Sequence, residues 1–411
     1  MITVAQARAR ILAAFAPLPA ETVALPDALG RVLADPLVAR LTQPPFAAAA
    51  MDGWAVRAAD VAGATGATPV TLARIGEAAA GHAFAGTLGA GQAVRIFTGA
   101  PLPDGADAVV MQEDADADTE TGAVRIRRAV PAGRFIRPAG LDFTAGEELL
   151  PRGRLLTARD VALAAGANRP WLRVHRRPRV AVLATGDEVV LPGEALGPNQ
   201  IVSSNALGLC ALVATQGGIA QHLGVARDDP DSLAAMADAA AGADLLVTTG
   251  GTAQGDHDLV RRVPGDRGLG VESLAIAMRP GKSLVFGRVG GVPLLGLPGN
   301  PVPAGVAAVL FLKPVLRALQ GLPTDDGAAP RTARLGAPLK AGDEREDFLR
   351  ATLSFDGDGR AVATPFPRQD NAAMSRLAQA DCLILRPAHA PAAAAGECVA
   401  ILPLGGSNLA L

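Results

Sequence analysis

An almost continuous apolar run, RPRVAVLATGDEVV at residues 177–190, constrains the fold more than any other feature of the chain. A run without alternation between apolar and polar residues is typical of a strand that is buried on both faces of a parallel sheet. It ends in Thr-Gly-Asp-Glu, and a helix-like segment with glycines at its end, SSNALGLCALVATQGG at 203–218, follows. A strand followed by a helix predicts a right-handed crossover to another parallel strand.

The same alternation of strands and helices continues along the chain. AQHLGVARDD at 220–229 and DLLVTTGGTAQGDHD at 244–258 read as further strands with their exits, and a helix-like segment lies between them. The stretch GVPLLGLPGNPVPAGVAAVLFLKPVLRAL at 291–319 adds a strand, a Pro-Gly turn and a long apolar helix. We therefore expect a doubly wound α/β domain around a parallel sheet.

The segments on either side of this domain have a different character. Residues 1–40 look helical, with a second helix-like segment at 27–40, and TARDVALAAGAN at 157–168 predicts a helix that Thr157 caps. Short β-branched runs separated by glycines predict a small β domain between residues 56 and 150, with the acidic segment 113–120 at the tip of a hairpin. Similar runs after the linker at 321–330 predict another.

Composition excludes several classes of protein. The formal net charge is −2 and the pI is about 6.2, whereas nucleic-acid-binding domains carry a basic stripe. Three scattered cysteines give neither a disulfide framework nor a zinc site. The N-terminal segment is too short and too charged to cross a membrane, because it carries Arg8 and Arg10. We therefore expect a soluble cytoplasmic protein that binds neither nucleic acid nor membrane.

Four turns are expected at one edge of the predicted sheet, where ligands bind in doubly wound folds. They are Thr185–Glu188, Arg227–Asp229, Thr248–Thr252 and Leu297–Pro301. Carboxylates beside glycine-rich turns suit a phosphorylated ligand held with a divalent cation such as Mg²⁺. Each turn by itself could be an ordinary connection, but four on one edge favour a ligand site.

Two other motifs do not support a different chemistry. Pro280-Gly281-Lys282-Ser283 imitates the end of a phosphate-binding P-loop, but Ile276 stands where that motif needs its first glycine. His257 lies between two aspartates, yet a lone loop histidine is more often a hydrogen-bonding group than a metal ligand. The residues alone therefore indicate an anion or nucleotide site with a metal.

Several motifs in one order carry a resemblance to a known family. They are PPF at 44–46, MDGWAVR at 51–57, RIFTGAPLPDGADAVVMQED at 95–114, ATGDEVV at 184–190, TTGGTAQGDHDLV at 248–260, MRPGKS at 278–283 and GLPGNPV at 296–302. With this order and spacing, the chain resembles the molybdopterin molybdenumtransferases, to which the E domain of gephyrin also belongs. That family inserts molybdate into adenylylated molybdopterin and releases AMP.

The resemblance implies the architecture and the partners. It implies a split elongated helical domain at 1–45 and 140–175, an inserted β domain at 46–139, a central molybdopterin-binding α/β domain at 176–325 and a C-terminal β domain at 330–411. It implies a homodimer whose site lies between the central domain of one subunit and the β domain of the other. Further partners implied are a molybdopterin adenylyltransferase and the molybdoenzymes that receive the cofactor.

The resemblance also assigns roles to individual residues. Asp187 and Glu188 would bind the divalent cation, Mg²⁺, or the adenylylated ligand, and Glu188 would take part in catalysis. The β domain would contribute three catalytic residues, which are Asp52, Thr98 and Asp142. The residues expected to bind the ligand or the oxyanion are Asp187, Asp228, Gly250, Gly251, Thr252, Asp258, Arg279, Lys282, Pro298, Gly299, Asn300, Pro301, Arg350 and Ser375.

The chain departs from the family pattern at several polar positions. The departures are Ala47–Ala50, Leu141, Ala253, Ala275, Ala277, Pro303 and the sequence Asp-Asn-Ala-Ala at 370–373. Each replaces a polar or glycine residue of the family pattern. They keep open the function of a paralogue that binds molybdopterin as a carrier or regulator. The motifs are also compatible with a molybdopterin adenylyltransferase and with a gephyrin-like scaffold.

Overall fold

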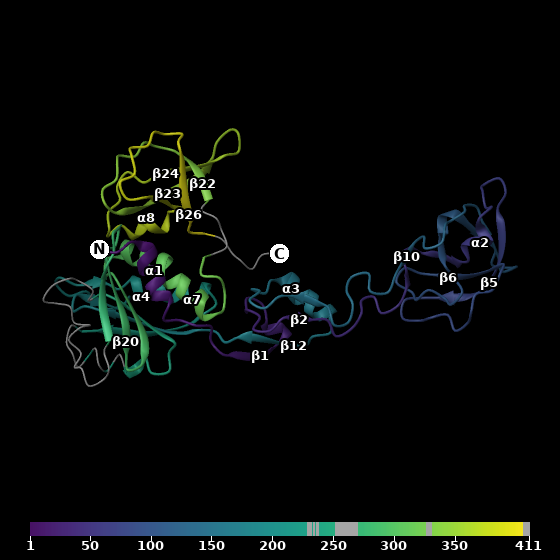
Figure 1. The fold of residues 1–411 in the computed structure, drawn as a ribbon, viewed down its shortest axis with the longest axis horizontal. Coiled ribbons are helices and arrows are strands. Elements are labelled where there is room, and N and C mark those ends of the chain that lie inside the picture. The colour runs from purple at the N-terminus through teal and green to yellow at the C-terminus, as the bar shows by residue number, and fades with distance from the viewer. Residues whose placement is uncertain (228–231, 233–234, 236–237, 251–269, 326–330, 406–411) are drawn as a thin grey trace.

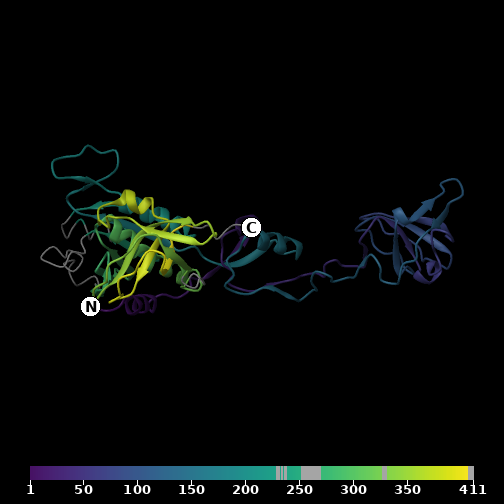
Figure 2. The ribbon, with the colours of Figure 1, turned by 90° about the horizontal axis from the view of Figure 1, so that it is seen from above.

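The computed structural model describes residues 1–227, 232, 235, 238–250, 270–325 and 331–405. The protein is elongated, and its parts follow one another along the long axis (Figure 1). The β domain that contains β5 and β6 forms one end, and the central sheet and the C-terminal β domain form the other. A thin region with β1, β2, β12 and α3 lies between the two ends in both views (Figures 1 and 2).

The central sheet has the strand order β16-β13-β17-β21-β20-β18. Its first four strands are parallel, and the last two are antiparallel to their neighbours. The parallel α/β architecture expected from the sequence is therefore confirmed, with an antiparallel edge added. The bounds are β13 (Arg179–Thr185), β16 (Ile219–Ala226), β17 (Leu245–Thr249), β18 (Gly270–Ala275), β20 (Ser283–Val289) and β21 (Val292–Leu297).

Helices cover one face of this sheet and form the largest core. Val182 and Val247 of the strands pack there with Phe311 and Leu316, all of them fully buried or nearly so. The helices are α1 (Val4–Leu12), α4 (Asn205–Thr215), α6 (Pro301–Ala307), the π-helical turn η5 (Ala308–Leu312) and α7 (Lys313–Leu319). The run 301–319 is long and apolar enough to cross a membrane, but 78% of its apolar window is buried inside the protein. It is therefore a core helix of the central domain.

The C-terminal β domain is a small barrel. Its strands follow the order β19-β23-β24-β22-β26-β25, and β23 also pairs with β25, which closes the ring. A parallel pair between β19 and β23 ties the barrel to the central domain. The bounds are β19 (Met278–Arg279), β22 (Arg331–Leu335), β23 (Glu346–Phe355), β24 (Ala361–Pro365), α8 (Met374–Ala378), β25 (Cys382–Arg386) and β26 (Cys398–Pro403).

The thin middle region consists of two antiparallel ribbons and one helix. Thr157 and Asp160 cap α3 reciprocally, so the helix predicted at this position is confirmed. The helix predicted at 27–40 is wrong: Gly30 has a φ of 71° and the segment turns into β2 instead. The bounds are β1 (Ala20–Ala24), η1 (Leu25–Asp27), β2 (Leu37–Val38), β11 (Glu148–Leu150), α3 (Ala158–Gly166) and β12 (Trp171–His175).

Helix α1 belongs by its packing to the central domain. Its buried residues Val4, Ala7 and Ile11 lie in the same core as α7. The resemblance implies that all of residues 1–45 belong to the middle region. The packing of α1 instead places residues 4–12 against the central domain. The other expected domain borders remain predictions.

The inserted β domain contains a sheet of order β7-β4-β6-β5-β9-β8. The acidic segment leads through β8 and a turn into β9, which confirms the predicted hairpin. The alanines at 48 and 49 form β3, which is buried and paired with β10. The bounds are β3 (Ala48–Ala49), β4 (Gly53–Val56), α2 (Ala58–Val61), β5 (Val70–Ala78), β6 (Gln92–Ile96), β7 (Ala108–Met111), η2 (Gln112–Asp114), β8 (Ala115–Ala117), β9 (Ala123–Ile126) and β10 (Ile136–Arg137).

Candidate functional site

Three strand exits lie side by side at the carboxyl edge of the central sheet. Ala184 of β13 pairs with Thr249 of β17, and Thr249 pairs with Leu297 of β21. Each strand therefore ends at the same level, and the turns that follow share one edge. This register brings together the Thr-Gly-Asp-Glu, Thr-Thr-Gly and Pro-Gly-Asn turns that the sequence analysis selected.

Glycine is required where these turns touch. Gly250 has a φ of +101°, and a Cβ there would lie 2.3 Å from the carbonyl oxygen of Thr185. A Cβ on Gly299 would lie 3.3 Å from the Cα of Gly250. The three turns consequently pack backbone against backbone. Backbone N–H groups at such turns can approach an anion closely.

The turn after β13 presents two carboxylates to solvent. Asp187 and Glu188 are both exposed, and Gly186 before them has a φ of +139°. A Cβ on Gly186 would lie 2.4 Å from a carboxylate oxygen of Glu188, so the glycine leaves room for that side chain. A side chain at residue 186 would therefore displace the Glu188 carboxylate. The two acidic groups are thus placed beside the glycine turns.

The donor set at this turn fits a magnesium ion. Within the described part of the chain, no three His, Cys, Asp or Glu side chains gather as a metal cage. Mg²⁺ is commonly held by only one or two carboxylates, together with water and the phosphates of a substrate. Asp187 and Glu188 supply that number of carboxylates at the edge where a phosphate is expected.

Asn205 holds two of the turns together, although it belongs to none of the motifs named from the sequence. Its Nδ2 donates to Thr249 Oγ1 at 3.0 Å and to the carbonyl of Gly299 at 2.7 Å. The Thr249 hydroxyl in turn donates to the carbonyl of Pro298 at 3.1 Å. The signal that could have found Asn205 is its place as the first residue of the helix after the acidic turn.

Two buried hydroxyl groups at this edge form no hydrogen bond with the described residues. Thr185 and Thr248 are 3% exposed, and their Oγ1 atoms have no hydrogen-bond partner among the residues that the structure describes. Leu183 pairs with Thr248, so the two threonines lie near each other on the same face of the sheet. A buried hydroxyl without a partner costs about 1–3 kcal/mol. The carboxyl edge therefore keeps hydrogen-bonding capacity that the described part of the chain does not use.

The loop before β20 brings Lys282 to the Pro-Gly-Asn turn. Gly281, with a φ of +90°, lies against Pro303 and Pro298, so the loop borders that turn. Lys282 is exposed and forms no ion pair with the part of the chain that is described. Its ammonium group is available to an anion at this place.

Arg279 is already paired with the C-terminal domain. Its guanidinium donates to both carboxylate oxygens of Asp347, at 2.7 and 2.8 Å, and to Asp343 at 3.3 Å. The hydrogen bond to Asp347 is the largest cause of the raised pKa of Arg279. An anionic ligand would have to compete with these carboxylates for Arg279.

Arg350 is likewise occupied by the protein. Its side chain is 1% exposed in β23 and donates to three acceptors of the loop 369–373. These are Gln369 Oε1 at 3.3 Å, the carbonyl of Asp370 at 2.9 Å and the carbonyl of Ala373 at 3.1 Å. Burial lowers the pKa of Arg350. The geometry is that of a residue that holds a loop in place.

The loop that Arg350 holds lies against the first turn of α6. The N–H of Val302 donates to the carbonyl of Asn371 at 3.1 Å. Leu377 of α8 approaches Gly305, where a Cβ would lie 2.5 Å from it. Ser375, also expected at the site, is exposed at the start of α8. The barrel thus contacts the central domain immediately after its Pro-Gly-Asn turn.

The β domain holds a second group of expected residues. Asp52 Oδ1 accepts hydrogen bonds from the N–H and the hydroxyl of Thr98, both at 2.7 Å. The backbone hydrogen bond is the largest cause of the lowered pKa of Asp52. Arg95 lies over the Trp54 ring at 5.4 Å and also favours the charged form of Asp52. Asp142 is exposed on the connection between the middle region and the β domain.

The two groups are far apart within one chain. Figures 1 and 2 both place the β domain at the opposite end of the molecule from the central sheet. Asp52 and Thr98 therefore do not meet Asp187, Glu188 or Lys282 of the same chain. Four expected ligand-binding residues, Asp228, Gly251, Thr252 and Asp258, lie outside the described residues.

Three sequence families match successive parts of the chain. They are described as the MoeA N-terminal region (domain I and II) at residues 2–167, a probable molybdopterin binding domain at 181–318 and the MoeA C-terminal region (domain IV) at 332–404. The strand exits described above lie within the second of these. The class of protein is therefore a multidomain one built around a molybdopterin-binding α/β domain.

Relatives extend over nearly the whole chain. Molybdopterin molybdenumtransferase 2 of Mycobacterium tuberculosis is 40% identical over 338 residues, which cover 81% of this chain and 83% of the relative. Molybdopterin molybdenumtransferase of Nostoc is 35% identical and covers 93% and 88%. A crystal structure of a molybdopterin biosynthesis MoeA protein from Pyrococcus horikoshii matches with a TM-score of 0.85 and 32% identity, over 99% of this chain and 100% of that one. The chain belongs to the molybdopterin molybdenumtransferase family.

Proposed function

We propose that this protein inserts molybdate into adenylylated molybdopterin, so that molybdenum cofactor forms and AMP is released. The observation that carries the proposal is the carboxyl edge of the central sheet. There, the exposed carboxylates of Asp187 and Glu188 stand beside glycine turns in a chain of this family. An anionic ligand with a phosphate and a divalent cation needs this combination of groups.

At the carboxyl edge, some groups would bind the substrate and one residue, Asn205, would hold the turns in position. The backbone at Gly250 and the Pro-Gly-Asn turn would accept the phosphate and the pterin, because backbone N–H groups at glycine turns can approach an anion closely. Lys282 would attract the oxyanion, because its ammonium group is exposed and unpaired among the described residues. Asn205 would keep the two turns at their spacing through its hydrogen bonds to both.

The acidic turn would hold the divalent cation. Asp187 and Glu188 would contribute carboxylate oxygens, and Mg²⁺ when bound would polarise the bond between AMP and the pterin phosphate. The absence of a side chain at Gly186 leaves room for the Glu188 carboxylate in this position. Asp228 and Asp258, outside the described residues, would add acidic groups from the neighbouring turns.

The site would be completed by a second copy of the chain. Asp52 and Thr98 are linked by two short hydrogen bonds but lie far from the carboxyl edge of their own chain. In a homodimer, the β domain of one copy would place this pair, with Asp142 nearby on its connection, against the central domain of the other. Mixing Asp52→Asn with Glu188→Gln subunits tests this: each variant alone is inactive, and the mixture regains activity if the site is shared. A mixture as inactive as its parts contradicts the shared site.

Two of the four alanines at 47–50 lie at buried positions. Ala48 and Ala49 are 5% and 0% exposed and form the strand β3. A polar side chain at either position would therefore be buried in this structure. Only Ala47 and Ala50 are partly exposed. These replacements are therefore compatible with turnover.

The direct test is the release of AMP by the purified full-length protein. Adenylylated molybdopterin, Mg²⁺ and molybdate are supplied, and AMP is measured with and without molybdate. Molybdate-dependent release supports the proposed function. Tight binding of the substrate without release would contradict it and would indicate a carrier. The proposed setting is the cytoplasm, with a molybdopterin adenylyltransferase as the source of substrate and molybdoenzymes as recipients of the cofactor.

A further inference from the structure

Arg95 of the β domain lies next to both residues of the hydrogen-bonded pair Asp52 and Thr98. Its strand β6 pairs with β4 in such a way that Gly53 lies opposite Ile96. Asp52 immediately precedes β4, and Thr98 follows the end of β6 by two residues. Asp52 and Thr98 therefore leave the sheet at the same end, and Arg95 is the residue of β6 that precedes this end by one position.

The guanidinium group of Arg95 binds the two segments that flank the backbone of Asp52. Its Nη1 donates to the carbonyl of Gly53 at 3.2 Å, and its Nη2 donates to Gln112 Oε1 at 2.8 Å. The N–H of Gln112 in turn donates to the carbonyl of Asp52 at 3.1 Å. One planar group thus connects the residue after Asp52 with the residue that holds the Asp52 carbonyl.

The same guanidinium group lies over two aromatic rings. Its Cζ is 5.4 Å from the centroid of the Trp54 ring and 4.9 Å from the centroid of the Phe97 ring. The face of an aromatic ring attracts a cation, so both rings favour this position of Arg95. Phe97 directly precedes Thr98 in the chain. Arg95 therefore contacts the neighbours of both Asp52 and Thr98.

The sheet itself does not depend on Arg95. Strand β4 is paired on both sides, with β6 and with β7, and its residues Ala55 and Val56 are fully buried. Loss of the guanidinium group should therefore leave the sheet folded and loosen only the segments at its end.

Arg74 of β5 offers a comparison within the same sheet. Its guanidinium group lies over the Trp54 ring at 5.9 Å, but it is paired with Glu77 at 3.0 Å. Among the described residues, Glu77 is the partner that its hydrogen bond reaches, and Asp52 and Thr98 are not. Arg74 thus shares with Arg95 the charge and the aromatic contact but not the hydrogen bonds beside Asp52.

We propose that Arg95 is a positioning residue of the proposed reaction, because its guanidinium group holds the segments of Asp52 and Thr98 in the relative position in which these two residues act. The inference rests on the proposed function and on the roles of Asp52 and Thr98 in it. Arg95 acts through these residues and not by contact with the substrate. Misplacement of a reacting group by about 1 Å can lower a rate by about 10²-fold.

The kinetics of molybdate-dependent AMP release by the full-length protein test the proposal. Arg95→Met should lower kcat at least about tenfold through misplacement of Asp52. The KM for adenylylated molybdopterin should stay within about twofold of the wild type, since contacts to the substrate are retained. Arg74→Met is the matched control and should leave kcat and KM unchanged. Equal effects of the two substitutions, or a change in KM alone, overturn the proposal.

A double-mutant cycle with Thr98→Val separates positioning from a general structural effect. Valine removes the hydroxyl that donates to Asp52 Oδ1 at 2.7 Å and keeps the backbone N–H. If Arg95 and Thr98 orient the same carboxylate, the double variant loses less activity than the product of the two single losses. Single losses that multiply would show that Arg95 acts independently of this pair.

Arg95→Lys distinguishes the geometry of the side chain from its charge. Lysine keeps the positive charge but has one nitrogen in place of the two that bind Gly53 and Gln112. Its kcat should remain at least about fivefold below that of the wild type. Wild-type activity of Arg95→Lys would mean that charge alone is needed, and it would overturn the positioning role.

Amide exchange reports on the same contacts without the reaction. In Arg95→Met, the amides of Thr98 and Gln112 should exchange faster than in the wild type and in Arg74→Met, while the temperature of global unfolding stays the same. If Arg95→Met unfolds at a lower temperature, Arg95→Lys takes its place in the cycle and in the exchange measurement. A wild type that releases no AMP in response to molybdate refutes the proposed function. Unchanged exchange at both amides refutes the role of Arg95 whether or not AMP is released.

Discussion

Replacing Arg350 by methionine separates two roles for this residue. The family resemblance assigns it to molybdate, whereas its guanidinium is 1% exposed and donates to three acceptors in the loop 369–373. Methionine keeps an unbranched apolar stem but donates no hydrogen bond, so the carbonyls of Asp370 and Ala373 lose their donor, whereas Gln369 Oε1 still accepts from the backbone N–H of residue 350. The loop would then detach from the start of α6, where it contacts Val302.

The expected magnitude follows from these contacts. Hydrogen bonds to a charged group contribute about 1.5–3 kcal/mol each, and water replaces part of this when the loop opens. We expect a loss of about 3 kcal/mol in the free energy of local opening, which corresponds to roughly 10²-fold faster amide exchange.

Amide exchange at residues 369–378 is the appropriate measurement. Arg368→Met is the matched control, since Arg368 is an exposed arginine of the same loop with no partner among the described residues. It should exchange as the wild type does. If Arg350→Met leaves the exchange unchanged and only raises the concentration of molybdate needed for AMP release, the holding role is refuted and Arg350 is a ligand.

Three further predictions concern the site and its support. Gly250→Ala should abolish AMP release while a far-UV spectrum stays native, because its Cβ would lie 2.3 Å from the Thr185 carbonyl; retained activity would show that the turn can move. Asn205→Ala should raise the KM for adenylylated molybdopterin about tenfold through looser turns, and an unchanged KM would contradict its role. The hydrogen bond from Arg345 lowers the pKa of Asp343 from 3.8 to about 2. This contribution to stability is present above pH 4 and is lost as the pH falls toward 2, so the acid unfolding of Asp343→Asn should depend less on pH in that interval.

Much of the central domain could be predicted from the sequence because its signals are local. The run at 177–190 lacks alternation since β13 is buried on both faces, and the Thr157–Asp160 pair caps α3 within four residues. The helix prediction for residues 27–40 was wrong because the spacing of the apolar residues in this segment resembles that of an amphipathic helix. In the structure, Leu33 and Leu37 instead pack in the core of the middle region, where tertiary contacts decide the backbone.

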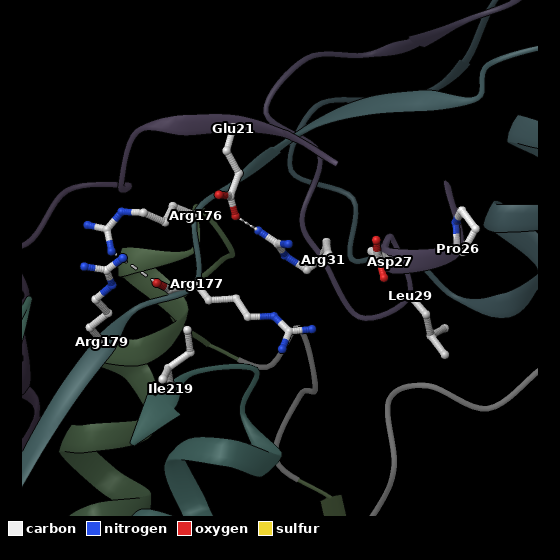
Figure 3. A pocket seen from close by; sticks show the side chains of 9 residues that line it. All are labelled: Glu21, Pro26, Asp27, Leu29, Arg31, Arg176, Arg177, Arg179 and Ile219. Atoms are coloured by element: carbon white, nitrogen blue, oxygen red, sulfur yellow. Dashed lines mark hydrogen bonds and ion pairs between the residues drawn. The ribbon is translucent and has the colours of Figure 1, made fainter. Parts of the chain in front are cut away.

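The rest depends on contacts between distant segments. Nothing near Arg350 in the sequence indicates that it donates to a loop some twenty residues later. A pocket lined by residues 21–31 and 176–179 forms because β1 pairs with β12, which brings these two segments together (Figure 3). Asn205 connects turns that are 44 and 94 residues away. Such associations follow from the topology and have no local pattern.

Single-turnover release of AMP by the Glu188→Gln variant tests whether the chemistry takes place at the carboxyl edge of the central sheet. The amide keeps the shape of the side chain and removes its charge. We expect a rate lower by about 10²-fold or more with molybdate and Mg²⁺ present, and no change for Glu148→Gln, which alters an exposed glutamate of the middle region. Equal rates for Glu188→Gln and the wild type would show that the carboxylate of Glu188 takes no part in the reaction.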